Sequence, residues 1–213
     1  MKEKKIFIFD LDGTLADAYK AIEKSLNYAR LKFGLEKVSF RQVKINVGRG
    51  DEKFINTFFT KDIAKEALKI YRSNHKRSLA LYSSLRPQAL VLLKALKKRN
   101  KIIALASNRP SPFTRIILES NGILKYFDYV LCADEVKRLK PNPKILKVIL
   151  GRFKLKPSFA VYIGDMAIDL ETAKRAGIDA VFVAGGSSSY KEALRYRRVK
   201  AIRNLKSILN LYK

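Results

Sequence analysis

Three side chains that could take part in chemistry each follow a short apolar segment of the sequence: Asp10, Ser107 and Asp165. Lys140 lies in the loop that follows a further apolar segment. In open α/β sheets the carboxyl ends of the strands meet at one edge, and ligands bind in the crevice outside that edge. If the apolar segments are strands, these four groups are expected to converge on one edge of a sheet.

The three carboxylates of Asp10, Asp12 and Asp165 form an all-oxygen set that suits a hard cation. Mg²⁺ prefers near-octahedral oxygen coordination, retains several water ligands and accepts an oxygen of a substrate phosphate. It would also offset the repulsion between these carboxylates and an incoming phosphate dianion. Lys140 supplies a compact positive charge for the same phosphate oxygens, and a carboxylate can act as the nucleophile in a two-step hydrolysis. The set therefore indicates Mg²⁺-dependent phosphoryl transfer.

The elements that must position these groups are five short segments rich in β-branched and aromatic residues. Each is apolar on both faces, as expected for strands of a parallel sheet that helices cover. Helical patterns lie between the later segments, and alternation of strand and helix predicts an α/β fold with a Rossmann-like, doubly wound parallel sheet. The five expected strands are Ile6–Phe9, Ile102–Ala106, Tyr129–Cys132, Ala160–Ile163 and Ala180–Val183.

The connection between the first two expected strands is far longer than a simple crossover requires. Its last part, Pro87–Arg99, can be the helix that leads into the second strand. The preceding segment, 16–84, is rich in helix formers, and its apolar residues recur at helical spacing from Ile22 to Phe33 and again from Ile63 to Tyr71. We therefore predict a small helical cap domain at 16–84, inserted into a catalytic core made of 1–15 and 85–213.

The composition of the 213 residues is unusual mainly in its formal net charge of +26. A field of this sign attracts phosphates, nucleic acid and anionic membranes alike, and a solvated basic surface is its simplest interpretation. The stretch Arg195–Arg198 interleaves basic and aromatic residues, a pattern found in nucleic-acid contacts, so nucleic acid stays an alternative partner although no recognised binding motif accompanies the charge. No apolar run approaches the ~20 residues that cross a bilayer, so no membrane partner is expected.

A single cysteine, Cys132, suits a reducing compartment, and we expect a cytoplasmic protein with that cysteine packed in a strand.

Four motifs occur in order along the chain and together resemble the haloacid dehalogenase-like superfamily. The run Asp10-Leu11-Asp12-Gly13-Thr14-Leu15 resembles its first motif, and Ser107-Asn108 resembles its second. The third is matched by Lys140-Pro141-Asn142-Pro143 and the fourth by Gly164-Asp165-Met166-Ala167-Ile168-Asp169. The resemblance covers the whole chain, including a helical cap inserted between the first two motifs.

Within the superfamily, the phosphoglycolate phosphatase-like branch is the most similar, through Asp17-Ala18, Val47-Gly48-Arg49-Gly50 and Ser107-Asn108-Arg109-Pro110. Members of that branch commonly have serine, threonine and lysine where this chain has Ala18, Ser107 and Arg109. The arginine keeps the charge of lysine but not its hydrogen-bonding geometry. These departures leave the expected reaction unchanged and the substrate open.

The resemblance implies a role for each matched residue. Asp10 attacks phosphorus and helps to bind Mg²⁺, while Asp12 protonates the leaving alcohol, later activates water, and offers its backbone carbonyl to the metal. Asp165 is a metal ligand, directly or through water, and Asp169 contacts the ligands rather than the metal itself. The transferring phosphate is held by Ser107, Asn108 and Lys140. The implied reaction is hydrolysis of a small phosphorylated metabolite, with 2-phosphoglycolate as the first candidate, through an aspartyl-phosphate.

Other interpretations of the same sequence remain open. A sugar-phosphate phosphatase or a β-phosphoglucomutase-like phosphotransferase could use the same scaffold, and a basic nucleic-acid-binding protein could keep the fold alone. Arg49, between two glycines of the expected cap, either meets a second anionic group of the substrate or is solvated. His75, in a basic run, is expected on the surface.

Overall fold

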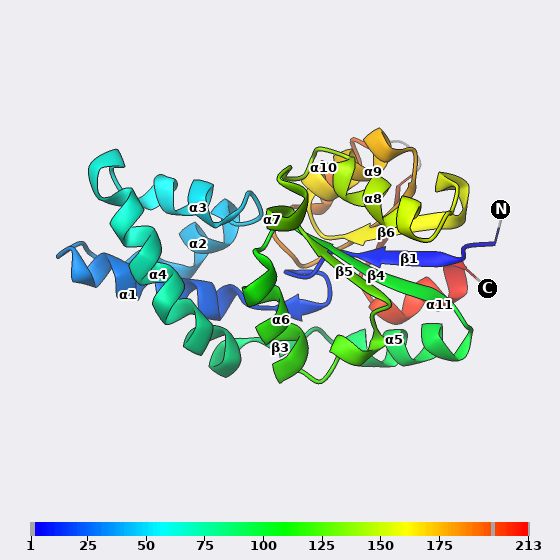
Figure 1. Cartoon of the computed structure of the whole chain (residues 1–213), viewed down its shortest axis with the longest axis horizontal. Helices are drawn as coiled ribbons and strands as arrows, with labels where there is room; N and C mark the ends of the chain where they lie inside the picture. The colour runs from blue at the N-terminus through cyan, green and yellow to red at the C-terminus, as the bar shows by residue number, and fades with distance from the viewer. Residues whose placement is uncertain (1–2, 197–198, 213) are drawn as a thin grey trace.

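A six-stranded parallel sheet forms the centre of the protein in a computed structural model that describes residues 3–196 and 199–212 (Figure 1). The strand order is β5-β4-β1-β6-β7-β8, so the first strand lies between β4 and β6. This arrangement is the predicted Rossmann-like α/β fold. The strands are β1 (Ile6–Phe9), β4 (Ile102–Ser107), β5 (Tyr129–Cys132), β6 (Ala160–Gly164), β7 (Asp179–Val183) and β8 (Lys200–Ile202).

The central strand β1 is buried on both faces, which explains its unbroken apolar sequence Ile-Phe-Ile-Phe. Ile6 and Ile8 belong to the apolar cluster on one face of the sheet, and Phe7 and Phe9 belong to the cluster on the other face. Helices cover both faces, as the doubly wound pattern requires (Figure 1). On the Phe7 side these are α5 (Ala89–Lys98), α6 (Ser111–Ser120) and α11 (Ile208–Leu211). On the Ile6 side they are α7 (Ala133–Val136), α8 (Lys144–Arg152), α9 (Ala167–Ala176) and α10 (Tyr190–Ala193).

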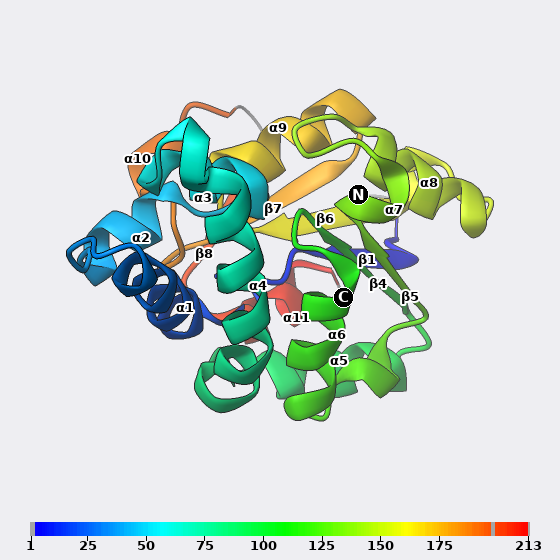
Figure 2. The ribbon, with the colours of Figure 1, turned by 60° about the vertical axis from the view of Figure 1, so that its left-hand side comes forward.

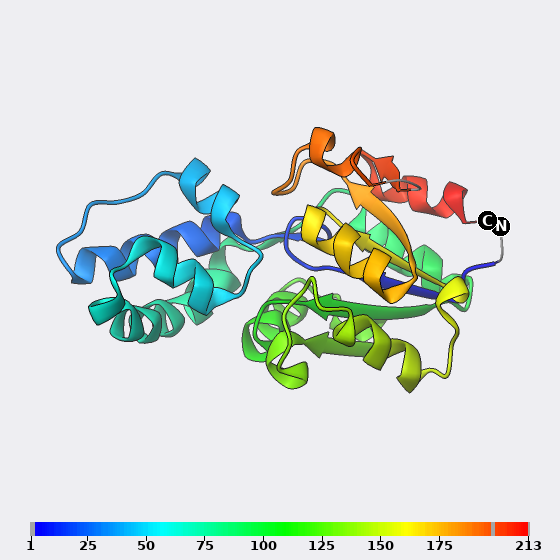
Figure 3. The same ribbon diagram turned by 90° about the horizontal axis from the view of Figure 1, so that it is seen from above.

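A separate group of helices lies between the first and second strands of the large sheet in the sequence. It projects from the end of the core that lies opposite the two termini (Figures 1 and 3). These helices enclose an apolar cluster of their own, and α1 packs against α4 (Figure 2). The helices are α1 (Tyr19–Lys32), α2 (Phe40–Asn46), α3 (Asp51–Phe58) and α4 (Lys61–Tyr82). Hereafter they are called the cap helices.

The two chain segments that join the cap helices to the core pair with each other. β2 (Ala16–Asp17) and β3 (Ser84–Leu85) form a short antiparallel sheet. Arg86, which follows β3, donates hydrogen bonds to the carbonyls of Gly13 and Ala184. The connection is therefore tied to the loops that follow two strands of the core.

The remaining described structure departs from the sequence-based expectation in a few places. β8 was not predicted, because its three residues begin with a lysine at the edge of the sheet and carry no apolar run. The short helices α2 and α3 were not separated from their neighbours. Short 3₁₀ turns occur at Leu124–Tyr126, Pro157–Phe159 and Leu205–Ser207. The predicted stretch Arg195–Arg198 lies partly outside the described residues, and no helix within those residues has the length and apolarity needed to span a bilayer.

Candidate active site

The candidate site lies where β1, β4 and β6 end at the same level of the sheet. Phe9 pairs with Leu105 on one side and with Ile163 on the other, and the backbone N–H of Asp10 donates to the Ile163 carbonyl at 2.9 Å. Asp10 is therefore held by the sheet itself at the point where the chain leaves the central strand. The side chains that follow the neighbouring strands lie around it, at the edge where the sequence places them.

The ammonium of Lys140 lies at the centre of this group. Its Nζ donates to Oδ1 of Asp10 at 2.8 Å, to Oδ1 of Asp169 at 2.7 Å and to the hydroxyl of Tyr162 at 3.0 Å. The side chains of Lys140 and Asp169 are 3% and 0% exposed, so this is a buried ion cluster. Burial by itself would lower the pKa of Lys140, but the two carboxylates outweigh it and raise that pKa well above its usual value. Tyr162 was not identified from the sequence, because it lies inside a strand and reads as an ordinary core residue.

Three buried carboxylates, those of Asp10, Asp165 and Asp169, each offer an oxygen within 4.8 Å of the other two. The Asp165 carboxylate accepts hydrogen bonds from the backbone N–H of Ser187 at 2.7 Å and from the Thr14 hydroxyl at 3.1 Å. Burial, followed by repulsion from Asp169, raises the pKa of Asp165 to about 7. Concentrated negative charge in a dry environment is the chemical condition for binding a cation.

This carboxylate group differs in one member from the set expected from the sequence. The side chain of Asp12 pairs with Arg109 instead, whereas Asp169, expected to support the ligands, has its carboxylate close to those of Asp10 and Asp165. Asp169 also accepts a hydrogen bond from the backbone N–H of Met166 at 3.1 Å, at the start of α9. Sequence spacing alone does not reveal this arrangement, because the first turn of α9 folds Asp169 back toward the end of β6.

Asp12 forms a bidentate ion pair with Arg109. Nε of Arg109 lies 2.8 Å from Oδ2 of Asp12, and Nη2 lies 2.9 Å from Oδ1. The remaining terminal nitrogen, Nη1, lies 2.7 Å from Nε2 of His75 on α4. Arg109 therefore links the loop after β1 to a cap helix through one planar guanidinium group.

His75 is 1% exposed, so the expectation that it lies on the surface was wrong. Its Nδ1 lies 2.9 Å from the Ser25 hydroxyl, and that hydroxyl donates its only hydrogen to the Ala21 carbonyl at 2.8 Å. His75 must therefore donate from Nδ1 and accept at Nε2, which defines a neutral tautomer. Burial and the positive charge of Arg109 both lower the pKa of His75 well below its usual value. The signal in the sequence was helical spacing: Ala64, Ala67, Tyr71 and His75 recur on the buried face of α4.

Ser107 and Asn108, at the end of β4, form hydrogen bonds with the backbone of the neighbouring loops. Nδ2 of Asn108 donates to the carbonyl of Gly48, in the loop between α2 and α3, at 2.9 Å, and its Oδ1 accepts from the backbone N–H of Lys140 at 2.8 Å. The Ser107 hydroxyl accepts from the backbone N–H of Arg109 at 3.1 Å. Both residues line the cavity, but Arg49 is exposed and does not line it.

Two glycines allow the loops to approach the site closely. A Cβ atom on Gly186 would lie 1.9 Å from Oδ2 of Asp165, and one on Gly48 would lie 2.4 Å from Sδ of Met166. Gly48 thus lets the loop between α2 and α3 pack against the start of α9, which brings this loop of the cap helices against the core. A cavity remains between them, lined by Asp10, Asp12 and Ser107 from the core and by apolar side chains of the cap helices.

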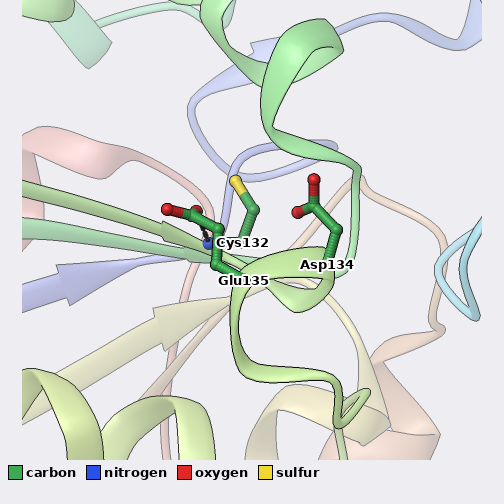
Figure 4. Close-up of side chains that lie close together, drawn as sticks. All are labelled: Cys132, Asp134 and Glu135. Carbon is green, nitrogen blue, oxygen red and sulfur yellow. Dashed lines mark hydrogen bonds between the residues drawn. The ribbon is translucent and has the colours of Figure 1, made fainter.

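A second group of potential metal ligands, Cys132, Asp134 and Glu135, lies at the start of α7 (Figure 4). Glu135 accepts a hydrogen bond from the backbone N–H of Cys132 at 2.8 Å, and Asp134 accepts from the backbone N–H of Ser111 at 3.0 Å. These carboxylates therefore cap the N-terminal ends of α7 and α6. Cys132 is buried, as predicted, and burial raises the pKa of its thiol to about 12.

Comparison with known proteins gives one family. The model of the haloacid dehalogenase-like hydrolase family matches residues 7–183. Two curated relatives, both named phosphoglycolate phosphatase, come from Photorhabdus laumondii and Vibrio parahaemolyticus. The first is 30% identical over 87% of this chain and 82% of its own length. The second is 31% identical over 81% of this chain and 80% of its own length. A crystal structure described as a predicted phosphoglycolate phosphatase from Haemophilus somnus superposes with a TM-score of 0.93 over 100% of both chains at 24% identity, which shows the shared fold.

Proposed function

Because the chain belongs to the haloacid dehalogenase-like hydrolases, we propose that it is a Mg²⁺-dependent phosphatase of small phosphomonoesters that works through an aspartyl-phosphate on Asp10. The observation that carries this proposal is the position of Asp10. Its carboxylate lies at the end of the central strand, faces the cavity, and has one oxygen 2.8 Å from the Lys140 ammonium. A buried carboxylate held in one orientation is well placed to attack a phosphorus atom.

The carboxylates of Asp10, Asp165 and Asp169 fit a magnesium ion. Hard oxygen donors are the ligands that Mg²⁺ prefers, and three buried carboxylates against the single Lys140 ammonium leave uncompensated negative charge. We propose that these three residues hold the ion. When bound, Mg²⁺ withdraws charge from the phosphate oxygens and so makes phosphorus more open to attack.

The proposed reaction has two steps. A carboxylate oxygen of Asp10 attacks phosphorus, the bond to the leaving oxygen breaks, and Asp12 supplies the proton that this oxygen needs. Asp12, now ionised, removes a proton from water, which attacks the same phosphorus and releases inorganic phosphate and the Asp10 carboxylate. The bidentate pair with Arg109 fixes the orientation of the Asp12 carboxylate beside the cavity.

The segment 16–84 is proposed to act as a cap domain on the core formed by 1–15 and 85–213. The cap helices have their own apolar cluster, and their two connections to the core lie side by side as β2 and β3. Paired connections of this kind suit a hinge. Such a cap would exclude water from the aspartyl-phosphate until the leaving alcohol has departed.

The substrate is proposed to be a small phosphorylated metabolite. The relatives named phosphoglycolate phosphatase make 2-phosphoglycolate one candidate. Sugar phosphates are another, and a β-phosphoglucomutase-like transfer differs only in that a sugar hydroxyl, rather than water, takes the phosphoryl group. Release of inorganic phosphate from a panel of phosphorylated metabolites separates hydrolysis from transfer.

The Asp10→Asn variant tests the mechanism, because an amide is a poor nucleophile at this position. Turnover should fall to background in Asp10→Asn and drop steeply in Asp12→Asn. Asp134→Asn is a matched control at an aspartate that follows the edge strand β5, since Asp134 does not line the cavity. It should retain turnover. Wild-type phosphatase activity in Asp10→Asn would refute the proposed function.

A chelator should also abolish activity, and added Mg²⁺ should restore it. In the absence of substrate, Mg²⁺ should raise the melting temperature of the wild-type protein but not that of Asp165→Asn, because a ligand that binds only the folded state stabilises it. Full activity in the chelated protein would show that the acidic group does not serve a metal.

A further inference from the structure

The half of the cavity that faces the cap carries apolar side chains beside the paired or neutral groups of Asp51, Tyr71 and His75, and is called the apolar half below. Beyond the carboxylates of Asp10 and Asp12, the cap contributes Ile22, Val47 and Phe54 to the wall, and the core contributes Phe113 and Met166. The phosphate must lie against Asp10 at the end of β1. The leaving group of a phosphomonoester would therefore extend into the apolar half.

Arg109 and Arg72, two cationic groups near this half, are each paired with an aspartate. Arg109 is bound to both oxygens of Asp12 and to His75, which is neutral. Arg72 is bound to both oxygens of Asp51, at 2.7 and 3.0 Å. Arg49, the cation expected to meet a second anionic group, is exposed and does not line the cavity.

The two carboxylates on this side of the cavity belong to the ion pairs with Arg109 and Arg72. The carboxylates of Asp12 and Asp51 both face the cavity. A carboxylate on the leaving group would lie beside Asp51 and would have to compete with Asp12, whose side chain is 22% exposed, for Arg109. Breaking one side of a largely buried ion pair is strongly unfavourable, whereas burying hydrocarbon against Phe54 and Val47 is favourable.

We propose that this site selects phosphomonoesters whose leaving group is uncharged and carries apolar surface, in preference to esters with a carboxylate such as 2-phosphoglycolate. The selectivity resides in the cap, in the apolar wall and in the engagement of Arg109 by Asp12 and His75. This inference rests on the proposed phosphatase function and narrows its substrate class.

Two esters of nearly equal shape test the proposal. Isobutyl phosphate has methyl groups where 2-phosphoglycolate has carboxylate oxygens, so the pair differs mainly in charge. The assay measures kcat/KM for both at ~0.15 M salt, where the long-range attraction of the more anionic ester to the basic protein is screened. We expect isobutyl phosphate to be preferred by on the order of tenfold or more, the range that a few apolar contacts supply. A higher kcat/KM for 2-phosphoglycolate would overturn the inference.

A matched pair of cap variants locates the selectivity. Phe54 lines the cavity, whereas Phe59 is packed in the same apolar cluster and does not line it. Phe54→Ala should lower kcat/KM for isobutyl phosphate by about tenfold more than for 2-phosphoglycolate, and Phe59→Ala should change both alike. Arg49→Ala should also leave the ratio unchanged. A selective loss of 2-phosphoglycolate hydrolysis in Arg49→Ala would place that arginine at the substrate and overturn the inference.

Binding to Asp10→Asn separates this inference from the proposed function. Calorimetry with that variant and Mg²⁺ measures the affinity for each ester without turnover. Tighter binding of isobutyl phosphate supports the inference, and equal affinities or no binding of either ester would overturn it. The proposed function fails on different evidence, namely phosphatase activity that survives the loss of the Asp10 carboxylate.

Discussion

Replacing Lys140 by methionine should destabilise the protein far more than the same change at Lys4, although both ammonium groups are buried. The side chains of both lysines are 3% exposed. The partners of Lys140 are buried, with Asp10 at 8% and Asp169 at 0% exposed. The partner of Lys4 is Asp179, 2.6 Å away, whose side chain is 58% exposed. The two variants thus differ mainly in what happens to the abandoned carboxylate.

The magnitude follows from that difference. Removing one member of a buried ion cluster costs about 3–5 kcal/mol, because a charge is left buried without compensation. In Lys4→Met the freed Asp179 is hydrated, and the main loss is the hydrogen bond from Lys4 to the Ser158 carbonyl at 2.8 Å, which is worth ~1 kcal/mol. Methionine keeps most of the packing volume of the lysine stem in both variants. At about 2–4 °C per kcal/mol for a chain of this size, Lys140→Met should melt roughly 10 °C lower than the wild type.

Urea unfolding followed by circular dichroism measures these free energies. The experiment belongs at pH 8 in Mg²⁺-free buffer, because burial raises the pKa of Asp10 well above its usual value and a proton could replace the ammonium at lower pH. Added Mg²⁺ should then restore part of the stability lost in Lys140→Met, since a cation near Asp10 and Asp169 compensates the same charge. Equal losses in the two lysine variants would refute the buried ion cluster as the source of the effect.

Three further outcomes follow from the structure. The folded-state pKa of His75 lies well below its unfolded value, so the contribution of His75 to stability is complete above pH 6.5 and declines by up to ~1.4 kcal/mol per pH unit below that value. Urea titrations at pH 7.5, 6 and 5 should show this decline in the wild type and a smaller one in His75→Gln. Gly186→Ala should abolish the rise in melting temperature caused by Mg²⁺, because its Cβ would lie 1.9 Å from Oδ2 of Asp165, while Gly151→Ala, with no atom within 4 Å of the added carbon, should leave that rise intact. Raising salt toward ~0.15 M should lower kcat/KM modestly, leave kcat nearly constant and remove binding of duplex DNA, because salt screens the long-range attraction due to the +26 charge. DNA binding that persists at that salt would favour the nucleic-acid alternative.

The sequence by itself determined the fold class and the edge of the sheet where the site lies. Asp10, Ser107 and Asp165 could be placed because each follows a run that is apolar on both faces, and such runs occur in strands buried by helices. The helical spacing of apolar residues from Ile22 to Phe33 likewise predicted α1. These features depend on local periodicity and on the topology of parallel sheets, both of which a single sequence carries. β8 escaped detection because an edge strand of three residues has too little periodicity to be recognised.

Only the tertiary structure decided how the charged side chains are partnered. Asp10 and Asp12 lie two residues apart, yet one carboxylate faces Lys140 from the loop after β5 and the other faces Arg109 from the loop after β4. Asp169 joins the carboxylate group because α9 turns it back toward the end of β6. His75 belongs to a basic run in the sequence, but the packing of α4 against α1 buries it. Each of these pairings joins residues far apart in the chain, and pairing of that kind depends on how whole elements pack, which local sequence pattern does not encode.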